Sequence, residues 1–265
     1  MLKTASSAYL THIAQIMEEG SSETARGLNF LEVLGHTYEV PMYNPVITIP
    51  ERSLGFKFAV AEPYWILSGN NRLSDIAPYG RMSPYSDDGY FMSGAYGPKI
   101  TDQLRYVCKT LAEDQGSRQA VINIWRENPG QSKDIPCTLS LQFVIRKNQL
   151  HCMATMRSSD AWLGLPYDSI MFSMASAYVI SILKHFYEVD NIMLGNLRMF
   201  LGSSHIYDRN FEDAEKVIKA WDFDTHPEID FNRLARKDPG MFLELLESWT
   251  IDEDSSGILE IGGMK

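Results

Sequence analysis

The chain has 265 residues, of which 45% are hydrophobic, and a formal net charge of -10 with a pI near 5.1. This composition is ordinary for a globular protein with a sizeable core. The acidic balance argues against a general nucleic-acid binder, because binding a phosphate backbone needs clustered Lys and Arg. An anionic ligand would therefore have to be bound by arginines placed at its own site, because the protein as a whole is acidic.

Two features point to a cytoplasmic protein without membrane contact. Residues 1–20 contain polar residues throughout and no uninterrupted apolar region of signal-peptide length. Apolar runs such as 175–183 are shorter and more interrupted than the roughly 20 residues that span a bilayer. The three cysteines, Cys108, Cys137 and Cys152, lack CxxC spacing, and their odd number leaves one without an intrachain partner. We expect a reduced compartment, no structural zinc, and a free thiol available for chemistry.

The N-terminal part combines a helix with strands. Apolar side chains at helical spacing predict an amphipathic helix over residues 3–19. Arg26 and a glycine precede a predicted strand at 28–34, and a second strand is predicted near 45–49.

The next segment, residues 56–67, is almost wholly apolar but contains Glu62. A buried carboxylate must be paired, protonated or catalytic, because burying a lone charge is very costly. The alternative is an exposed turn where the helix breaks near Pro63. Residues 68–98 then form a long polar, Gly-rich segment, and such irregular segments often carry function.

The rest of the chain continues the mixture of helices and strands, with no internal repeat, which predicts one α+β domain over residues 1–265 and not a regular βαβ array. The remaining helices are predicted at 101–112, where Thr101 caps the helix, at 169–187, after residue 210 and at 239–249. The remaining strands are predicted at 120–125, at 138–143 and at 191–201. One further strand follows a hairpin turn at 147–149 and ends at Met156.

Cys137 is the candidate nucleophile. A thiolate is the reactive form of cysteine, and a nearby arginine lowers the thiol pKa. If the predicted hairpin forms, the strand that ends before Arg157 returns beside the strand that follows Cys137. The alternative is a structural cysteine, which is the interpretation we give Cys108 and Cys152.

Further polar residues suit a nucleotide monophosphate. Arg157 and Ser158 offer a planar fork and a hydroxyl to a phosphate, with Arg26 and Arg118 as additional candidates and Asp160 as an acceptor. Each arginine alone is equally typical of a solvated surface.

His205 and Tyr207 lie two residues apart and face one side of an extended segment, where they can bind a sugar hydroxyl or form a structural pair. HExxH, P-loop and GxGxxG motifs are absent, so we predict neither a metal nor a nucleoside triphosphate.

Taken together, these segments resemble the thymidylate synthase family over most of the chain. The resemblance rests on ordered matches: Glu62 in EPYWILSG, Tyr96 in GAYG, Arg118 in GSRQAVINIW, Pro136-Cys137, Met156-Arg157-Ser158-Ser159-Asp160, Leu163-Gly164-Leu165-Pro166-Tyr167-Asp168, and His205-Ile206-Tyr207.

The resemblance implies a large twisted mixed sheet flanked by helices, with the sheet forming a homodimer interface. It implies that Cys137 attacks C6 of a pyrimidine nucleotide and that C5 captures the one-carbon unit of 5,10-methylenetetrahydrofolate. In the chemistry that the resemblance implies, Glu62 transfers protons and orders water, and Tyr96 lies beside the cysteine. The implied phosphate-binding residues are Arg26, Arg157, Ser158 and Arg118 from the partner subunit. His205 and Tyr207 would bind the sugar, and Asp160 and Trp65 would contact the folate.

Several departures from the family pattern point to cytosine and to hydroxymethylation. Asp168 stands where synthases that recognise uracil carry Asn, and a carboxyl group suits the exocyclic amine of cytosine. Asp168 and Met156 make the chain similar to the phage deoxycytidylate hydroxymethylases. The tryptophan segment before the Tyr-Gly motif is rewritten, with Tyr85 among the nearest aromatics, and Gln119 replaces a second arginine.

We therefore predict dCMP 5-hydroxymethylation. The alternatives are reductive methylation of dUMP or dCMP, hydroxymethylation of dUMP, and a catalytically silent nucleotide-binding module. The presence of both Cys137 and Glu62 speaks against the silent module.

Overall fold

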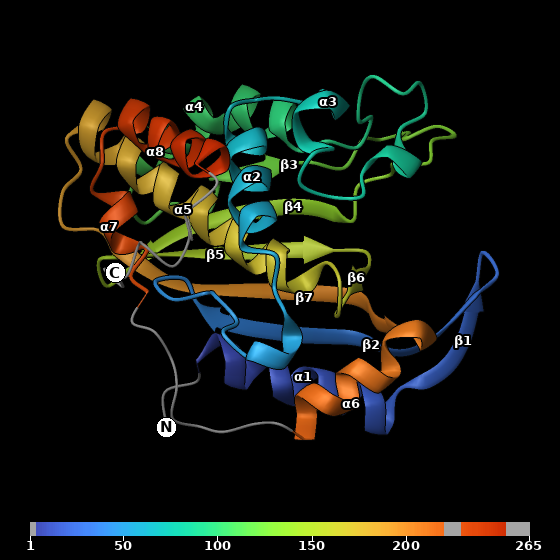
Figure 1. The fold of residues 1–265 in the computed structure, drawn as a ribbon. Helices are drawn as coiled ribbons and strands as arrows, with labels where there is room; N and C mark the ends of the chain where they lie inside the picture. Colours follow the sequence, from blue (N-terminus) through green and yellow to red (C-terminus); the bar gives the residue numbers. More distant parts are fainter. Residues whose placement is uncertain (1–3, 220–228, 253–265) are drawn as a thin grey trace.

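The computed structural model describes residues 4–219 and 229–252. Within these residues a mixed seven-stranded sheet runs in the order β1-β2-β7-β5-β4-β3, and β6 pairs with β7 (Figure 1). The strands are β1 (Ser21–Ala25), β2 (Leu28–Pro41), β3 (Val121–Asn123), β4 (Thr138–Arg146), β5 (Gln149–Met156), β6 (Ser159–Asp160) and β7 (Met193–Tyr207). Strands β5 and β6 run parallel to β7 and the other pairs are antiparallel, which confirms the predicted α+β class.

Two tight turns fix the hairpins of this sheet. Lys147 and Asn148 have φ values of 52° and 58°, and Arg26 and Gly27 have 51° and 76°. Two consecutive residues with positive φ are typical of the turn that matches the twist of a two-residue hairpin. The predicted 147–149 turn is confirmed, and Arg26 sits at the tip of the β1–β2 hairpin, which projects beyond the sheet (Figure 1).

Helices cover one face of the sheet in layers (Figure 1). Helix α5 packs on β5 and β7, helices α2, α4, α7 and α8 pack on α5, and α1 packs on β2 and β7. The helices are α1 (Ala5–Glu19), α2 (Phe56–Leu67), α3 (Leu73–Ile76), α4 (Gly97–Glu113), α5 (Leu165–Tyr187), α6 (Phe211–Lys219), α7 (Asn232–Ala235) and α8 (Pro239–Ile251), with 3-10 turns η1 (Pro50–Arg52), η2 (Ser83–Tyr85) and η3 (Asp208–Asn210).

Helix α5 is the centre of the core. It is long and apolar enough to cross a membrane by length and composition, but 72% of its most apolar window is buried inside the protein. Ile170, Phe172 and Met174 are fully buried. The expectation that every apolar run is too short to span a membrane was therefore wrong for the length of α5. Its burial inside the protein is that of a core helix.

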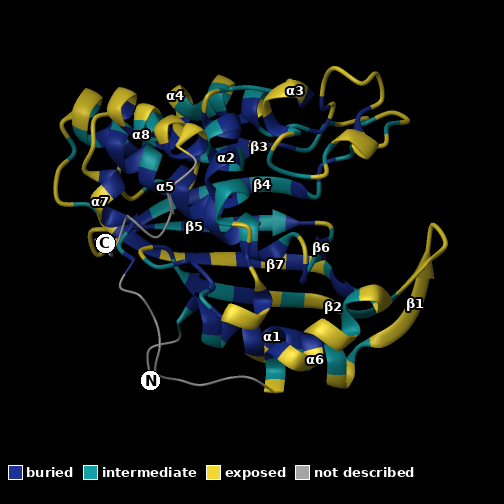
Figure 2. Ribbon diagram, viewed as in Figure 1, coloured by how far each residue is buried: buried dark blue, intermediate teal, exposed yellow. Residues whose placement is uncertain are grey.

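The opposite face of the sheet is open in the single chain. Along β7, Leu197, Met199 and Leu201 are buried, whereas the alternate residues Arg198 and Phe200 are exposed. Figure 2 shows this alternation of buried and exposed positions along the strand. Period-two burial of this kind means that one face packs against the helices and the other meets solvent or a partner.

Two local predictions and one alternative interpretation were wrong. Residues 45–49 form no strand; Val46, Ile47 and Ile49 are buried in irregular backbone between two prolines, so burial does not require sheet pairing here. Pro63 does not break α2. Helix α4 begins at Gly97, so Thr101 lies inside it and donates to the Gly97 carbonyl instead of capping.

Two boundaries also moved. Helix α5 begins at Leu165, four residues before the prediction, because Pro166 is well suited to a first helical turn. Strand β7 continues to Tyr207 and not to residue 201, because the small residues at 202–204 remain paired with β2. His205 and Tyr207 consequently lie on a strand and not in a loop.

A buried histidine pair ties α1 to the sheet and makes stability depend on pH. The Nε2 atom of His12 lies 2.8 Å from the Ser204 hydroxyl, and its ring stacks on His36 with centroids 4.1 Å apart. Burial, with a smaller contribution from His36, lowers the pKa of His12 from 6.5 to about 3. The folded state therefore disfavours a proton that the unfolded chain accepts below about pH 6.5, so stability is lost as the pH falls from 6.5 towards 3.

We expect His12→Gln to flatten this acid limb. Between pH 7 and pH 5 the histidine should account for about 2 kcal/mol of lost unfolding free energy, which the variant should not lose. Urea denaturation of both proteins at the two pH values measures the difference. The exposed His185→Gln serves as the matched control, and equal losses in wild type and His12→Gln would contradict the assignment.

Candidate active site

The β4–β5 hairpin brings Cys137 and Arg157 together. Thr138 pairs with Met156, so the residue before β4 faces the residue after β5, and the Arg157 amide donates to the Cys137 carbonyl at 2.9 Å. The Arg157 side chain donates to the carbonyls of Pro136 and Ile135 and reaches the Cys137 sulfur at 3.8 Å. The predicted contact is confirmed, and Arg157 stays exposed, so its other donors can reach a ligand.

The expected lowering of the Cys137 pKa was wrong in net direction. Burial raises the pKa of this thiol, and the guanidinium of Arg157 only partly offsets it; Asp168 and Asp134 raise it further. The resting protein therefore favours the thiol, and a base must take its proton when it attacks. Cys108 and Cys152 are buried, and burial raises the pKa of each thiol to about 12.

Cys137 opens onto a cavity of about 150 Å³ at the end of the sheet where β4 begins. Four elements contribute to it: α2, the segment before α4, the segment before β4, and the first turn of α5. Its lining includes six residues with functional side chains, namely Glu62, Trp65, Tyr96, Asp134, Cys137 and Asp168, together with the apolar Ile66, Met82 and Met92. The exposed-turn interpretation of Glu62 is wrong, because this carboxyl faces the cavity from inside α2.

Two carboxyl groups in the cavity hold their protons near neutral pH. Desolvation, and then the charge of Asp168, raises the pKa of Glu62 to about 8. Desolvation, and then Asp160, raises the pKa of Asp168 to about 7. The first turn of a helix favours a carboxylate, yet here the loss of water outweighs the helix dipole. Each group can therefore donate and accept protons at physiological pH.

Tyr96 lies beside the nucleophile at the start of α4. Its hydroxyl accepts from the Thr138 hydroxyl at 3.0 Å and from the Thr138 amide at 3.3 Å. Burial raises the Tyr96 pKa, with Asp168 and Cys137 adding to the effect. Tyr96 therefore keeps its proton and can donate it to a group bound next to Cys137.

His205 and Tyr207 form an aromatic group with Phe30 at the end of β7. The His205 ring is 5.0 Å from Tyr207 and 5.3 Å from Phe30, and its Nδ1 atom is buried with no hydrogen-bond partner in the described part of the chain. Burial lowers the His205 pKa; Asp160 and Glu32 raise it and Arg26 lowers it. The neutral ring can offer one nitrogen to a ligand, and Arg26 lies within electrostatic reach of the same site.

Asp160 shapes the turn between β6 and α5. Its Oδ1 atom accepts from the amides of Trp162 and Leu163, each at 2.9 Å, and its second oxygen is not used in that turn. Ser158 is half-buried between Arg157 and β6. Asp160 lies within electrostatic reach of Asp168 in the cavity, because its charge helps to raise the Asp168 pKa.

Arg118 does not join this site in the single chain. It precedes β3, and its carbonyl accepts from Gln142, well along β4 from Cys137. The side chain is exposed and does not line the cavity. A role for Arg118 at Cys137 thus requires another subunit.

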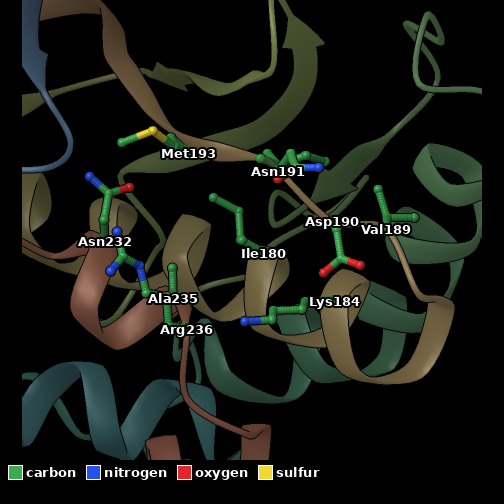
Figure 3. Close-up of a pocket in the computed structure, with 10 residues that line it drawn as sticks. Ile180, Lys184, Val189, Asp190, Asn191, Met193, Asn232, Ala235 and Arg236 are labelled. Atoms are coloured by element: carbon green, nitrogen blue, oxygen red, sulfur yellow. The ribbon is translucent and has the colours of Figure 1, made fainter.

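A larger hollow of about 330 Å³ lies at the other end of α5 (Figure 3). Its walls carry Lys184, Asp190 and Arg236 over apolar residues such as Ile180. The lining contains neither a thiol nor a hydroxyl nucleophile, so size alone does not identify the reactive site. Among the described residues there is no group of three or more His, Cys, Asp or Glu arranged to hold a metal ion.

Asp134 lines the cavity, but the sequence alone did not identify it as a candidate site residue. It lies three residues before Cys137, and burial raises its pKa. The only sequence signal was an acidic residue next to the Pro-Cys pair in a polar segment, and surface loops carry many such residues.

Comparison with known proteins agrees with this geometry. The family model described as thymidylate synthase matches residues 7–252. The chain belongs to the thymidylate synthase family. It is similar to two thymidylate synthases of Buchnera aphidicola, from the subspecies Baizongia pistaciae (25% identity, covering 80% of this chain and 83% of the relative) and Schizaphis graminum (26%, 79% and 82%). It is also similar to a deoxyuridylate hydroxymethyltransferase of Bacillus phage SP01 (26%, 97% and 71%).

Thymidylate synthase family members transfer one-carbon units to pyrimidine nucleotides with methylenetetrahydrofolate as donor. The cavity combines apolar walls from Trp65 and Met82 with polar groups such as Glu62 and Asp168, which suits a ligand with apolar faces and polar edges. The Trp65 indole is fixed by its hydrogen bond to the Arg72 carbonyl at 3.0 Å.

Proposed function

We propose that this protein transfers a one-carbon unit from 5,10-methylenetetrahydrofolate to C5 of the cytosine ring of dCMP and completes the reaction as a hydroxymethylation. The observation that carries the proposal is Asp168, a carboxyl group in the Cys137 cavity whose pKa is raised to about 7. A neutral carboxyl donates to cytosine N3 and accepts from its exocyclic amine at the same time.

The chain's own residues perform the proton and bond steps. Cys137 adds to C6 of the ring, and Asp168 holds the edge that contains N3 and the amine. Glu62 transfers protons and orders water beside the ring, and Tyr96 donates next to Cys137. When bound, the folate supplies the one-carbon unit, held by Trp65 and Asp160.

Outside the ring, the polar groups described above bind the rest of the nucleotide. Arg157, Ser158 and Arg26 hold the phosphate, and His205 and Tyr207 hold the sugar. In this proposal Arg118 of a second subunit completes the phosphate site, and Gln119 leaves it with one arginine fewer than the family pattern.

Mass spectrometry of products formed with methylenetetrahydrofolate tests the substrate. Incubation with dCMP should give a nucleotide heavier by one CH₂O unit, whereas CMP and dUMP should give much less. Unchanged dCMP would refute the proposal.

A second candidate, hydroxymethylation of dUMP, is favoured by the similarity to the phage deoxyuridylate hydroxymethyltransferase over 97% of this chain. The dUMP arm of the same experiment decides between the two nucleotides. Reductive methylation, as in the thymidylate synthases, would instead release dihydrofolate, which absorbance detects, while hydroxymethylation returns tetrahydrofolate.

The open sheet face supports a homodimer. It carries the exposed Phe200 and the Glu39–Arg198 ion pair, and covering it would bury the apolar side chain. We expect sedimentation at twice the 30.1 kDa mass of one chain. Phe200→Asp should shift the protein towards monomer, whereas substitution of the exposed Met241 of α8, Met241→Asp, should not. A monomeric wild type would contradict the expectation.

A further inference from the structure

Asp134 is a third acidic group in the reactive cavity, alongside Glu62 and Asp168. It lies on the segment that leads into Cys137, and its charge raises the pKa of the Cys137 thiol, which places the carboxyl within electrostatic reach of the sulfur. None of the steps assigned above uses this group.

The structure holds the Asp134 carboxyl in one position. The Gly94 amide donates to its Oδ2 atom at 2.7 Å. This close approach requires glycine, because a Cβ at residue 94 would lie 2.8 Å from the Oδ1 atom. Asp87 fixes the same segment by accepting from the Ser132 hydroxyl at 2.5 Å and from the Lys133 amide at 2.9 Å.

Asp87 belongs to the 81–89 segment in which this sequence departs from the family pattern. The departure therefore does more than remove an aromatic residue. It supplies the carboxylate that holds residues 132–133, and with them the position of Asp134 beside the cavity.

The three carboxyl groups differ in whether any interaction favours the ionised form against the effect of burial. For Glu62 and Asp168 the two leading influences, desolvation and a neighbouring carboxylate, both favour the protonated form. The pKa of Asp134 is also raised by burial and by Asp87, but the Gly94 amide and Arg126 act in the opposite direction. Asp134 is thus the carboxyl group of the cavity whose ionised form is stabilised by a hydrogen bond from an amide and by the charge of an arginine.

We propose that Asp134 is the general base that takes a proton from the water molecule that completes hydroxymethylation. The assignment rests on the proposed function, because only a reaction that ends with water needs this base. It separates the role of Asp134 from that of Glu62, whose raised pKa suits it to hold a proton beside the ring.

The step balances without any oxidant or reductant. After one-carbon transfer the ring carries an exocyclic methylene at C5 and the Cys137 sulfur at C6. The water oxygen forms a bond to the methylene carbon, its proton passes to Asp134, and the electron pair of the exocyclic double bond moves into the ring. The C5–C6 double bond then forms, the C6–S bond breaks, and Cys137 leaves as thiolate.

Asp134→Asn tests this assignment, with the exposed Glu127→Gln of the same region as the matched control. Without folate, exchange of tritium from C5 of dCMP requires Cys137 but no water capture. Glu127→Gln should therefore exchange at the wild-type rate, and Asp134→Asn should exchange at that rate or faster, because the charge of Asp134 raises the pKa of the Cys137 thiol. With methylenetetrahydrofolate, Asp134→Asn should form at least roughly 100-fold less hydroxymethyl product, the scale of a general base. Intact-protein mass spectrometry should then show the methylene-nucleotide adduct on Asp134→Asn, and 2-mercaptoethanol should discharge it as a thioether.

Three outcomes would overturn the assignment or its basis. Hydroxymethyl product at the wild-type rate would show that Asp134 is not the base. Parallel loss of folate-free exchange in Asp134→Asn, but not in Glu127→Gln, would show that it supports the cysteine step or the fold. A wild type that exchanges tritium yet makes no hydroxymethyl product from dCMP or dUMP would refute the proposed function itself.

Discussion

Cys137→Ala should abolish release of tritium from C5-labelled dCMP, lowering it by at least roughly 10⁴-fold, the scale expected when a covalent nucleophile is removed. The physical reason is that C5 of a pyrimidine becomes nucleophilic only after C6 has been attacked. Because Cys137 is half-buried at the mouth of the cavity, its replacement removes the sulfur without opening the core.

Cys108→Ala is the control for this experiment. Cys108 is fully buried in α4 and away from the cavity, so the variant should lose some stability but retain tritium release. Thermal unfolding of both variants separates loss of chemistry from loss of fold. Undiminished release from Cys137→Ala would remove the covalent mechanism and leave the silent nucleotide-binding module as the better hypothesis.

The contact between Cys137 and Arg157 was predictable because it depends on a hairpin, and hairpin register follows from alternation and a two-residue turn. The protonation of Cys137 was not predictable in the same way. The sequence indicates which charges lie nearby along the chain, but the loss of water around the thiol depends on four separate segments that close the cavity.

Long-range contacts account for the other misses. Residues 45–49 have the composition of a strand, yet they pair with none of the described strands, and Val46, Ile47 and Ile49 pack into the core from irregular backbone. The position of the Asp134 carboxyl depends on a hydrogen bond from the Gly94 amide, 40 residues away along the chain, and no local pattern predicts such a contact.

Asp168→Asn should reverse the preference between cytosine and uracil nucleotides. An amide held in the same cavity can accept from uracil N3-H and donate to O4, whereas cytosine offers an acceptor at N3 and a donor amine. Each mismatched buried hydrogen bond costs about 1–3 kcal/mol, so two of them should lower the ratio of kcat/KM for dCMP to kcat/KM for dUMP by at least roughly 30-fold.

The ratio is its own control, because a general loss of fold lowers both values together. A second readout is the pH profile. Since the Asp168 pKa is about 7, the wild type should lose its advantage on dCMP as the pH rises above 7 and the carboxyl can no longer donate to N3. Asp168→Asn carries no such proton, so its preference should not change over that range. A variant that keeps the wild-type ratio and the wild-type pH profile would show that selection between the two bases is made by other residues of the cavity.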